Sequence, residues 1–600
     1  MCGIVGYTGC SDATKKVLKG LEILEYRGYD SAGICRETEL GQNIIKTTGR
    51  VKALCQKAQN KKEGSFCAIG HTRWATHGAV SERNAHPHRV GGCTLVHNGI
   101  IENYKELREK LALAGACFVS ETDSEVGCAL INEYYGREND PFKAILCATE
   151  ELCGSYALAI MLKGHSGRIY AVRRGSPLII GKGSDGHYLA SDLTAIIPFT
   201  RTYYPLEEGE IAELSPQGVK IYGVGEPAWK TTEMSFEASK KGGYEHFMLK
   251  EMWEQPQAVK KCLSPRVSGA LPCALDRELL NGIKEIHIVA CGSAMHAGLF
   301  GSSLIQELAG VRAQSYIASE YRYKMPVTDK GTLVIIVSQS GETADSIACL
   351  RHAKERGLTT LGIVNAVETT IAREADICLY TYAGPEVAVA TTKGYMTQAS
   401  LLSLIGVNLA LEKGKISAEM GKRLTQCLIF NAPRAIEGVL KMEKEIENIA
   451  KKLYERNNIF YIGRGIDYAL AQEASLKLKE ISYIHCEAYA AGELKHGTIS
   501  LIEKGTPVIA IATEKRLFDK LDSNIKEVKS RGAFTVLICT KNIKNARECA
   551  DLVLEIESEG ELDGAFGAVA AVQMLAYRIA RLRGCDIDKP RNLAKSVTVE

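Results

Sequence analysis

Residues 332–343, "TLVIIVSQSGET", decide the fold of the second half of this 600-residue chain. An apolar run of strand length leads directly into a polar turn, and the residues after the turn have the pattern of a helix. A buried strand followed by a helix is the repeating unit of α/β proteins. The same pattern recurs at "EIHIVACG" (285–292), "GLTTLGIVN" (357–365), "NIFYIGRG" (458–465), "TPVIAIAT" (506–513) and "GAFTVLICT" (532–540). The sequence therefore predicts parallel sheets with helical crossovers.

These strands also repeat at a nearly constant spacing. The interval from Val334 to Val508 is almost the same as the interval from Gly357 to Gly532. Chance similarity between ordinary α/β segments is the alternative, but two similar spacings in the same order favour a duplicated subdomain. We place the first copy at 247–425 and the second at 426–590.

Residues 1–230 have a different pattern. Short β-type runs such as "SYALAIMLKG" (155–164) alternate with turn residues and a few helices, which predicts a layered α+β domain with much antiparallel sheet. A polar, glycine-containing stretch at 231–246 predicts the linker to the α/β half.

Composition and charge exclude several classes of protein. The net charge is +3, without a basic block, so neither nucleic acid nor a membrane surface is an expected partner. Twenty cysteines are scattered without a CxxC pair or a preceding signal peptide, so we expect reduced thiols, a cytoplasmic location and no structural zinc. The apolar stretch 565–582 is interrupted by Gln573 and Arg578 and predicts a buried helix.

Cys2 is the first candidate for chemistry. If Met1 is removed, Cys2 carries a thiol next to a free α-amino group, which titrates near neutral pH and can take the thiol proton. An N-terminal cysteine can then be nucleophile and base at once. The alternative is a cysteine that merely begins a buried strand.

Three turn-rich positions would complement such a nucleophile. Arg73 could bind a carboxylate, Asn98 with the Gly99 N–H could form an oxyanion hole, and Asp123 could pair with an ammonium group. Each residue alone is more often a surface ion pair or a turn former. Together they suit an α-amino acid whose side-chain carbonyl is attacked, which describes glutamine.

The turn at 338–343 predicts a phosphate site. Ser338, Ser340 and Thr343 would present hydroxyls beside backbone N–H groups at a helix N-terminus, together with Gln339. A simple helix cap is the alternative, but it requires fewer hydroxyls. Neither a GxGxxG nor a P-loop pattern is present here, so a nucleotide is not predicted.

Four residues near the C-terminus could act on a sugar phosphate. Lys477 and Glu480 are three residues apart on one helix face, and His496 lies in a turn bounded by glycines. A carboxylate and an imidazole could move the protons of ring opening, although a surface salt bridge is the alternative. Lys595 could form a Schiff base or be an ordinary tail lysine.

Seven motifs in order identify a resemblance over nearly the whole chain. They are "MCGIVGY", "EYRGYDSAG", "GHTRWATHG", "LVHNGIIENY", "SQSGETADS", "GELKHG" and "DKPRNLAKSVTVE". The chain resembles the glucosamine-6-phosphate synthase family of glutamine:fructose-6-phosphate amidotransferases. The resemblance implies an N-terminal-nucleophile (class II glutaminase) domain, two SIS domains, a homodimer, and no metal or organic cofactor.

The resemblance also implies roles for individual residues. Cys2 is the nucleophile, Asn98 and Gly99 stabilise the oxyanion, Trp74 gates an ammonia channel, and the other glutamine-binding residues are Arg73, Thr76, His77 and Asp123. On the sugar side, Glu480 moves a proton between C1 and C2, Lys477 stabilises the intermediate, His496 opens the ring and Lys595 forms the Schiff base. The sugar phosphate is bound by Ser293, Ser338, Gln339, Ser340, Thr343, Val389 and Ala594, and 591–600 form the tail of this site.

Two positions depart from the family pattern. Ala294 stands where the family often has Ser, so one hydrogen bond to the sugar or its phosphate is not expected here, and Thr391 stands where Ser is common. The sequence thus predicts an enzyme that hydrolyses L-glutamine, channels the ammonia and converts D-fructose 6-phosphate to D-glucosamine 6-phosphate. The alternatives are a related amidotransferase or deglycase acting on another phosphosugar, and a sugar-phosphate sensor without catalysis.

Overall fold

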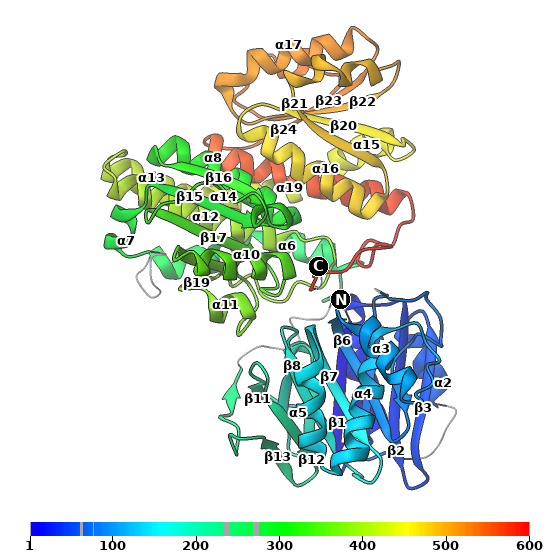
Figure 1. The fold of residues 1–600 in the computed structure, drawn as a ribbon. Coiled ribbons are helices and arrows are strands. Elements are labelled where there is room, and N and C mark those ends of the chain that lie inside the picture. The colour runs from blue at the N-terminus through cyan, green and yellow to red at the C-terminus, as the bar shows by residue number, and fades with distance from the viewer. Residues whose placement is uncertain (1, 60–63, 76, 233–240, 268–274, 599–600) are drawn as a thin grey trace. The chain divides into compact units, whose positions relative to one another are not determined.

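The computed structural model describes residues 2–59, 64–75, 77–232, 241–267 and 275–598. The chain forms two compact units (Figure 1). Unit 1 comprises Met1–Ser239 together with Ala594–Glu600, and unit 2 comprises Lys240–Leu593. Half of the predicted linker, residues 233–240, lies outside the described residues.

Unit 1 is built on two antiparallel sheets, as the short β-type runs predict. The eight-stranded sheet has the order β14-β11-β9-β10-β1-β4-β2-β3, and the six-stranded sheet has the order β13-β12-β8-β7-β6-β5. The strands are β1 (Gly3–Gly9), β2 (Ser31–Thr38), β3 (Gly41–Thr48), β4 (Cys67–Arg73), β5 (His88–Val90), β6 (Cys93–Ile101), β7 (Gly154–Leu162), β8 (Ile169–Arg174), β9 (Ile179–Lys182), β10 (Gly186–Ala190), β11 (Thr202–Pro205), β12 (Ile211–Ser215), β13 (Gly218–Ile221) and β14 (Lys230–Thr231). The helices are α1 (Ala13–Leu24), α2 (Val51–Gln59), α3 (Tyr104–Leu113), α4 (Asp123–Glu138) and α5 (Pro141–Glu151).

The two sheets of unit 1 pack face to face, with helices on their outer faces. Strand β1 shows the arrangement, because its successive side chains point to opposite faces. Ile4 lies in the core between the sheets, whereas Val5 and Tyr7 pack in the core shared with α1. Every residue of β1 is therefore buried, and Cys2 is held at the start of this strand.

Unit 2 contains two five-stranded parallel sheets of the same topology. Their orders are β16-β15-β17-β18-β19 and β21-β20-β22-β23-β24. The strands are β15 (Glu285–Ala290), β16 (Arg312–Ile317), β17 (Thr332–Ser338), β18 (Thr359–Val364), β19 (Ile377–Tyr380), β20 (Asn458–Gly463), β21 (His485–Ala490), β22 (Pro507–Ala512), β23 (Phe534–Thr540) and β24 (Leu552–Ile556). Each strand of the first sheet thus has its counterpart in the second, which confirms the duplication inferred from the spacing.

Helices cover both sheets of unit 2 and join them in one core. They are α6 (Phe247–Val267), α7 (Arg277–Gly282), α8 (Gly292–Ala309), α9 (Ala318–Tyr321), α10 (Ala344–Glu355), α11 (Thr370–Glu374), α12 (Lys393–Glu412), α13 (Ala418–Gln426), α14 (Ala432–Leu440), α15 (Glu443–Leu453), α16 (Ile466–Ser482), α17 (Phe518–Lys529), α18 (Ala546–Cys549) and α19 (Glu561–Leu582). One hydrophobic cluster extends from Met248 to Ile587 and takes side chains from both sheets. The two subdomains are therefore fused through their inner faces, and helices α8 and α16 pack against each other there.

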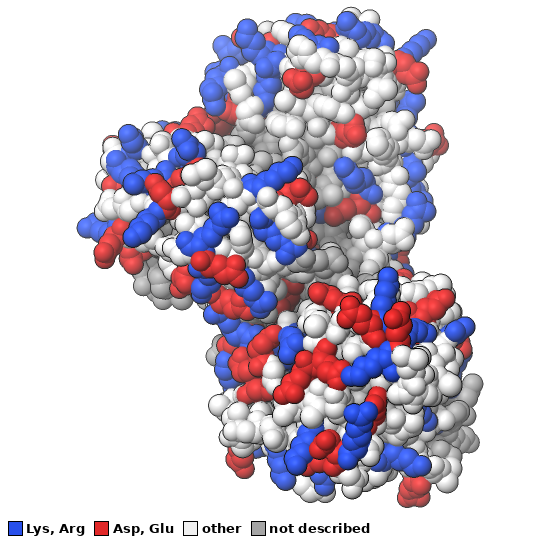
Figure 2. Space-filling model, in the orientation of Figure 1, with Lys and Arg blue, Asp and Glu red and all other residues white. Residues whose placement is uncertain are grey.

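Two helices, α12 and α19, have the length and mean hydropathy of membrane spans, but 89% of each apolar window is buried inside the protein. Their apolar side chains form the shared core of unit 2, and the prediction of a buried helix at 565–582 is confirmed. The nineteen cysteines within the described residues are all free thiols. On the face that Figure 2 shows, Lys and Arg side chains are interspersed with Asp and Glu.

Candidate active sites

Cys2 lies where the first strand of unit 1 meets the end of β4. Its Sγ accepts a hydrogen bond from the Trp74 backbone N–H at 3.2 Å and lies 3.5 Å from the Trp74 carbonyl oxygen. Burial raises the pKa of the Cys2 thiol, whereas the Trp74 amide and the Arg73 guanidinium lower it. Burial outweighs these two effects, so the pKa of the Cys2 thiol is raised overall, although a hydrogen-bond donor and a positive charge stand beside the sulfur.

Asn98 and Gly99, the residues expected to stabilise an oxyanion, lie on β6 close to Cys2. The Asn98 amide Nδ2 donates to the Cys2 carbonyl oxygen at 3.1 Å. Gly99 has φ +122°, and a Cβ at this position would lie 2.0 Å from the Ser155 carbonyl oxygen. Only glycine therefore fits here, and its backbone adopts a conformation that other residues rarely reach. Cys2 and Gly99 both line one pocket of unit 1.

Arg73 and Asp123 also line this pocket, but each has partners within the protein. The Arg73 guanidinium donates to the carbonyl oxygens of His77, Gly78 (3.3 Å) and Ala79 (3.4 Å). Asp123, at the start of α4, accepts from the Ile101 backbone N–H at 2.9 Å. These hydrogen bonds hold both side chains in the pocket wall.

Trp74 and His77 belong to the same pocket wall, and Thr76 lies outside the described residues. The Trp74 ring packs edge-on against Tyr29, with 5.9 Å between ring centroids. The channel role expected for Trp74 remains a prediction.

Sequence reasoning missed a group of four histidines beside this pocket. His71, His86, His88 and His97 are each at most 4% exposed. Their rings lie close together: 4.0 Å separates the centroids of His71 and His86, and 4.7 Å those of His86 and His88. Burial lowers the pKa of all four imidazoles, so they are neutral at pH 7. Their signal in the sequence was the density of histidine between 71 and 97.

The predicted phosphate loop of unit 2 connects the carboxyl end of β17 to α10. Ser338 Oγ accepts from the Gly341 backbone N–H at 3.0 Å and lies 3.0 Å from Thr343 Oγ1. Ser340 Oγ accepts from the Glu342 N–H at 3.2 Å. Three hydroxyls and the beginning of a helix thus converge as the sequence predicts, at the sheet edge where α/β proteins bind ligands.

Glu342 anchors this loop to Thr370, a contact that the sequence does not predict. Its carboxylate accepts from both the backbone N–H and the hydroxyl of Thr370, each at 2.8 Å. The loop also turns tightly at Gly341, where φ is +67° and a Cβ would lie 2.0 Å from Thr369 Oγ1. Contacts with Thr369 and Thr370 therefore define the path of the loop.

Lys477 and Glu480 form an ion pair on α16, but this pair is not on the surface. Lys477 has no exposed area, and its Nζ lies 3.7 Å from a second carboxylate, Glu473. Burial lowers the pKa of Lys477, but the Glu480 and Glu473 carboxylates outweigh this effect and raise it. The lysine is therefore a firmly held positive charge, which excludes the surface-salt-bridge alternative.

Glu473 links the two subdomains and was not predicted. Its carboxylate accepts from Ser293 Oγ at 2.9 Å and lies 2.9 Å from His296 Nδ1, and both partners are on α8 of the first subdomain. The Ser293 hydroxyl donates to this carboxylate, and its expected role in binding the sugar phosphate stays a prediction.

The remaining sugar-site residues are more dispersed. The Val389 N–H donates to the Asp588 carbonyl oxygen at 3.0 Å, so the 389 loop meets the segment that leads to the tail. His496 ends a short turn, Glu493–His496, and its side chain is exposed. Within the described part of the chain, no hydrogen bond or ion pair joins His496 to Lys477 or Glu480. Ala594 and Lys595 belong to unit 1 by their contacts.

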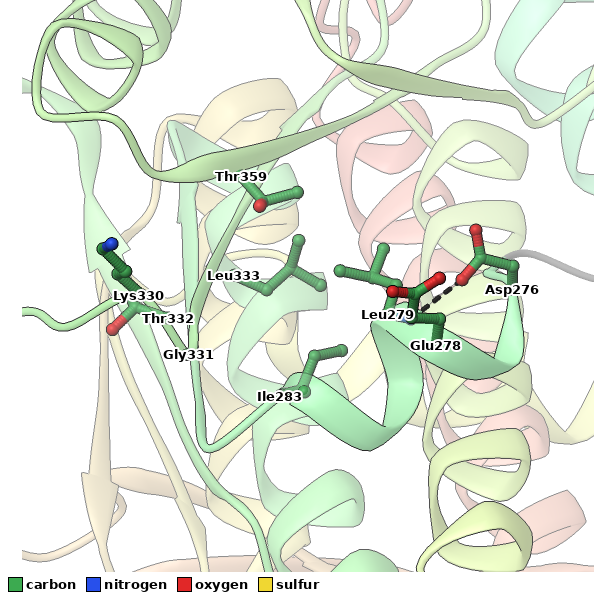
Figure 3. Close-up of a pocket in the computed structure, with 10 residues that line it drawn as sticks. Asp276, Glu278, Leu279, Ile283, Lys330, Gly331, Thr332, Leu333 and Thr359 are labelled. Atoms are coloured by element: carbon green, nitrogen blue, oxygen red, sulfur yellow. Dashed lines mark hydrogen bonds between the residues drawn. The ribbon is translucent and has the colours of Figure 1, made fainter.

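A further pocket of unit 2 is lined by none of the predicted site residues, and Figure 3 shows its lining. Its lining includes Leu279 and Ile283. It also includes Thr332 and Leu333, the first two residues of β17, and Thr359, the first residue of β18. Ser338 is at the opposite, carboxyl end of β17. The pocket is therefore at the amino ends of these strands, whereas the predicted phosphate loop is at the carboxyl end of β17.

Comparisons with known proteins agree with the division of the chain into unit 1 and the two subdomains of unit 2. Residues 71–198 match the model of the glutamine amidotransferase domain, and residues 279–407 and 452–582 match that of the SIS domain. The glutamine--fructose-6-phosphate aminotransferase [isomerizing] of Clostridium acetobutylicum is 44% identical over 611 residues, and that of Thermus thermophilus is 42% identical over 612, each covering 100% of both chains. The solved C-terminal domain of glucosamine-fructose-6-phosphate aminotransferase from Francisella tularensis is 36% identical, with a TM-score of 0.55, over 58% of this chain and 100% of that one.

Proposed function

Since the chain belongs to the family of glutamine--fructose-6-phosphate aminotransferases of the isomerizing type, we propose that its two units divide that reaction between them. The enzyme takes nitrogen from L-glutamine and converts D-fructose 6-phosphate to D-glucosamine 6-phosphate. Unit 1 releases ammonia from glutamine, and unit 2 binds and aminates the sugar. The single observation that supports the assignment of unit 1 is that Cys2 and Gly99 line one pocket, while the Asn98 amide donates to the Cys2 carbonyl oxygen.

In unit 1, Cys2 acts as the nucleophile. The Cys2 thiolate attacks the side-chain carbonyl carbon of glutamine, and the negative charge moves onto the carbonyl oxygen. Asn98 Nδ2 and the Gly99 N–H stabilise this oxyanion. With Met1 removed, the Cys2 α-amino group takes the thiol proton and passes it to the departing nitrogen, so that ammonia leaves as the thioester forms. Water then hydrolyses the thioester to glutamate and frees the thiol. Arg73 and Asp123 hold the α-carboxylate and the α-ammonium group of the substrate.

In unit 2, the loop 338–343 binds the phosphate of the sugar. Its hydroxyls and the positive end of the α10 dipole suit a dianion. Glu480 carries a proton between C1 and C2, and the buried Lys477 ammonium stabilises the negative charge that develops on the sugar oxygen. His496 opens the ring, and Lys595 forms an imine with C2 of the open ketose.

The expected homodimer, cytoplasmic location and absence of a cofactor complete the proposal. Large apolar side chains are exposed near the edge of the first sheet of unit 2, at Ile317 (50%), Tyr323 (70%) and Val327 (97%). Such residues are common where a second subunit packs. The free thiols suit a reducing compartment.

One assay tests the division of labour between the units. Ammonia release from glutamine, isomerisation of fructose 6-phosphate to glucose 6-phosphate, and glucosamine 6-phosphate formation are measured for wild type, Cys2→Ala and Lys595→Arg. We expect Cys2→Ala to release no ammonia but to isomerise the sugar. Lys595→Arg should release ammonia but form no glucosamine 6-phosphate, because a guanidinium group cannot form the imine.

Each assignment has an outcome that contradicts it. Ammonia release by Cys2→Ala at the wild-type rate excludes Cys2 as the nucleophile. Synthesis by Lys595→Arg excludes an imine at this lysine. A wild-type protein that binds both substrates and turns over neither is the sensor, and one that aminates a different phosphosugar is the related amidotransferase.

A further inference from the structure

His71 is a histidine that the proposed chemistry does not use, and it lies between the two halves of the glutamine site. It is in β4, where it is paired with Ile4 of β1, two residues along the chain from Cys2. The His71 side chain has no exposed surface, so a glutamine molecule that enters from solvent does not contact it. Its side chain instead reaches the residues just before Gly99 on β6.

Two hydrogen bonds fix the proton of His71. Its Nε2 lies 2.9 Å from the His97 carbonyl oxygen and 3.1 Å from Asn98 Oδ1. A backbone carbonyl oxygen can only accept, so Nε2 must carry the proton. Burial lowers the pKa of His71 to about 3, so the ring is neutral and Nε2–H is its single donor.

The proton of His71 in turn fixes the Asn98 side chain. An Asn amide can be flipped end for end to exchange its oxygen and nitrogen, and its hydrogen-bond partners decide which orientation is adopted. With Oδ1 toward the Nε2–H of His71, the amide Nδ2 faces Cys2 and donates to its carbonyl oxygen at 3.1 Å. The opposite orientation would direct an N–H at an N–H and an oxygen at an oxygen.

We propose that His71 is a positioning residue for glutamine hydrolysis, which turns the Asn98 amide so that its N–H groups face the developing oxyanion. The proposal rests on the proposed function, since it assumes that Asn98 stabilises the tetrahedral intermediate. His71 touches neither substrate nor the reacting atoms and acts through Asn98.

The second nitrogen of His71 supports a role beyond packing. Nδ1 is buried and has no hydrogen-bond partner among the described residues. A buried polar atom without a partner destabilises the folded state, and an apolar side chain would avoid that loss. The imidazole is therefore explained by its Nε2–H.

The test compares two substitutions of His71 with a matched control. His71→Leu removes the donor, whereas His71→Gln can return an N–H to about the place of Nε2. The control is His187→Leu on β10, which removes a buried imidazole that contacts the Ser215 carbonyl at 2.8 Å. Steady-state glutamine hydrolysis gives kcat and KM, with inhibition by L-glutamate as a measure of binding.

We expect His71→Leu to lower kcat for ammonia release by about 10- to 100-fold, near or below the loss of an oxyanion donor, with KM and glutamate inhibition within about twofold. His71→Gln should recover kcat to within about fivefold of wild type, and His187→Leu should keep it. In an Asn98→Ala background, His71→Leu should lower kcat no further, because its effect passes through Asn98.

Three results would overturn the proposal. These are an unchanged kcat in folded His71→Leu, a rise in KM without a fall in kcat, and full additivity with Asn98→Ala. If His71→Leu fails to fold, the Gln variant decides: wild-type kcat supports the proposal, and a kcat reduced as far as in Asn98→Ala contradicts it. Cys2→Ala run in parallel separates this outcome from failure of the proposed function, because ammonia release by that variant contradicts the nucleophile and not the role of His71.

Discussion

At the scale of single residues, Glu473 shows how unit 2 holds a buried charge. Its carboxylate has no exposed area and receives hydrogen bonds from α8 and the positive charge of Lys477 from its own helix. A carboxylate in a protein interior destabilises the fold unless such partners surround it. Glu473 therefore fixes Lys477 in place and fastens the first subdomain to the second.

Glu473→Gln should weaken both the hold on Lys477 and the attachment of the first subdomain to the second. The neutral amide leaves Lys477 with one anionic partner, so we expect sugar isomerisation to fall about tenfold and the free energy of unfolding to fall by about 3 kcal/mol. The isomerisation assay and denaturant unfolding measure the two effects, and glutamine hydrolysis should be retained. Glu437→Gln, which breaks the exposed pair with Lys441, is the control and should cost at most about 1 kcal/mol. Equal losses in the two variants would contradict the role given to Glu473.

The sequence predicts some of these residues better than others. The contact between Lys477 and Glu480 could be predicted from the sequence, because residues three apart share a helix face. Glu473 and its α8 partners, Ser293 and His296, could not, because they are far apart in the sequence and nothing local indicates the contact. For the same reason, the contact between His71 and Asn98 across two strands was not predicted.

At the scale of elements, the loop between β17 and α10 joins a predicted strand to a predicted helix. Its local features follow from sequence, because an apolar run next to Ser, Gly and Thr has few alternative structures. Its anchoring by Glu342 on Thr370 is tertiary and was not predicted. The loop is therefore held in place by Thr370, which lies outside the sequence motif 338–343.

Replacing both Ser338 and Ser340 by Ala should weaken binding of the sugar phosphate. Two hydroxyl donors to a dianion are lost, and hydrogen bonds to charged groups contribute about 1.5–3 kcal/mol each. We expect the KM for fructose 6-phosphate to rise well over tenfold, while ammonia release from glutamine alone is retained. An unchanged KM would mean that the hydroxyls only stabilise the loop and the start of α10.

At the scale of the whole molecule, the two units differ in how they hold histidine. In unit 1, burial lowers the pKa of His71, His86, His88 and His97, and in unit 2 it lowers the pKa of His287. The unfolded chain takes up protons near pH 6.5, and the folded unit does not. The stability of unit 1 is therefore complete above about pH 6.5 and is lost as the pH falls toward the lower pKa values of the folded state.

We expect unit 1 to unfold before unit 2 in mild acid. Each histidine whose folded pKa lies below 5 should remove about 2 kcal/mol of stability at pH 5. Trp253→Phe removes the one tryptophan of unit 2, so the fluorescence of Trp74 and Trp229 then reports on unit 1 alone. Its thermal midpoint should fall strongly between pH 7 and pH 5, while circular dichroism still records folded unit 2. A midpoint that does not change with pH would contradict this prediction.

The number and order of the subdomains could be predicted from the sequence because duplication leaves a spacing that needs no tertiary information. The grouping of the tail could not. Ala594–Glu600 follows unit 2 directly in sequence but belongs to unit 1 by its contacts.

This grouping of the tail has a consequence during synthesis on the ribosome. The segment Met1–Ser239 of unit 1 emerges early, but Ala594–Glu600 of the same unit follows only after all of Lys240–Leu593 has been translated. At about 5–20 residues per second, that interval lasts roughly 20–70 s. A nascent chain therefore contains Met1–Ser239 well before the last segment of unit 1 exists, and translation itself delays completion of this unit.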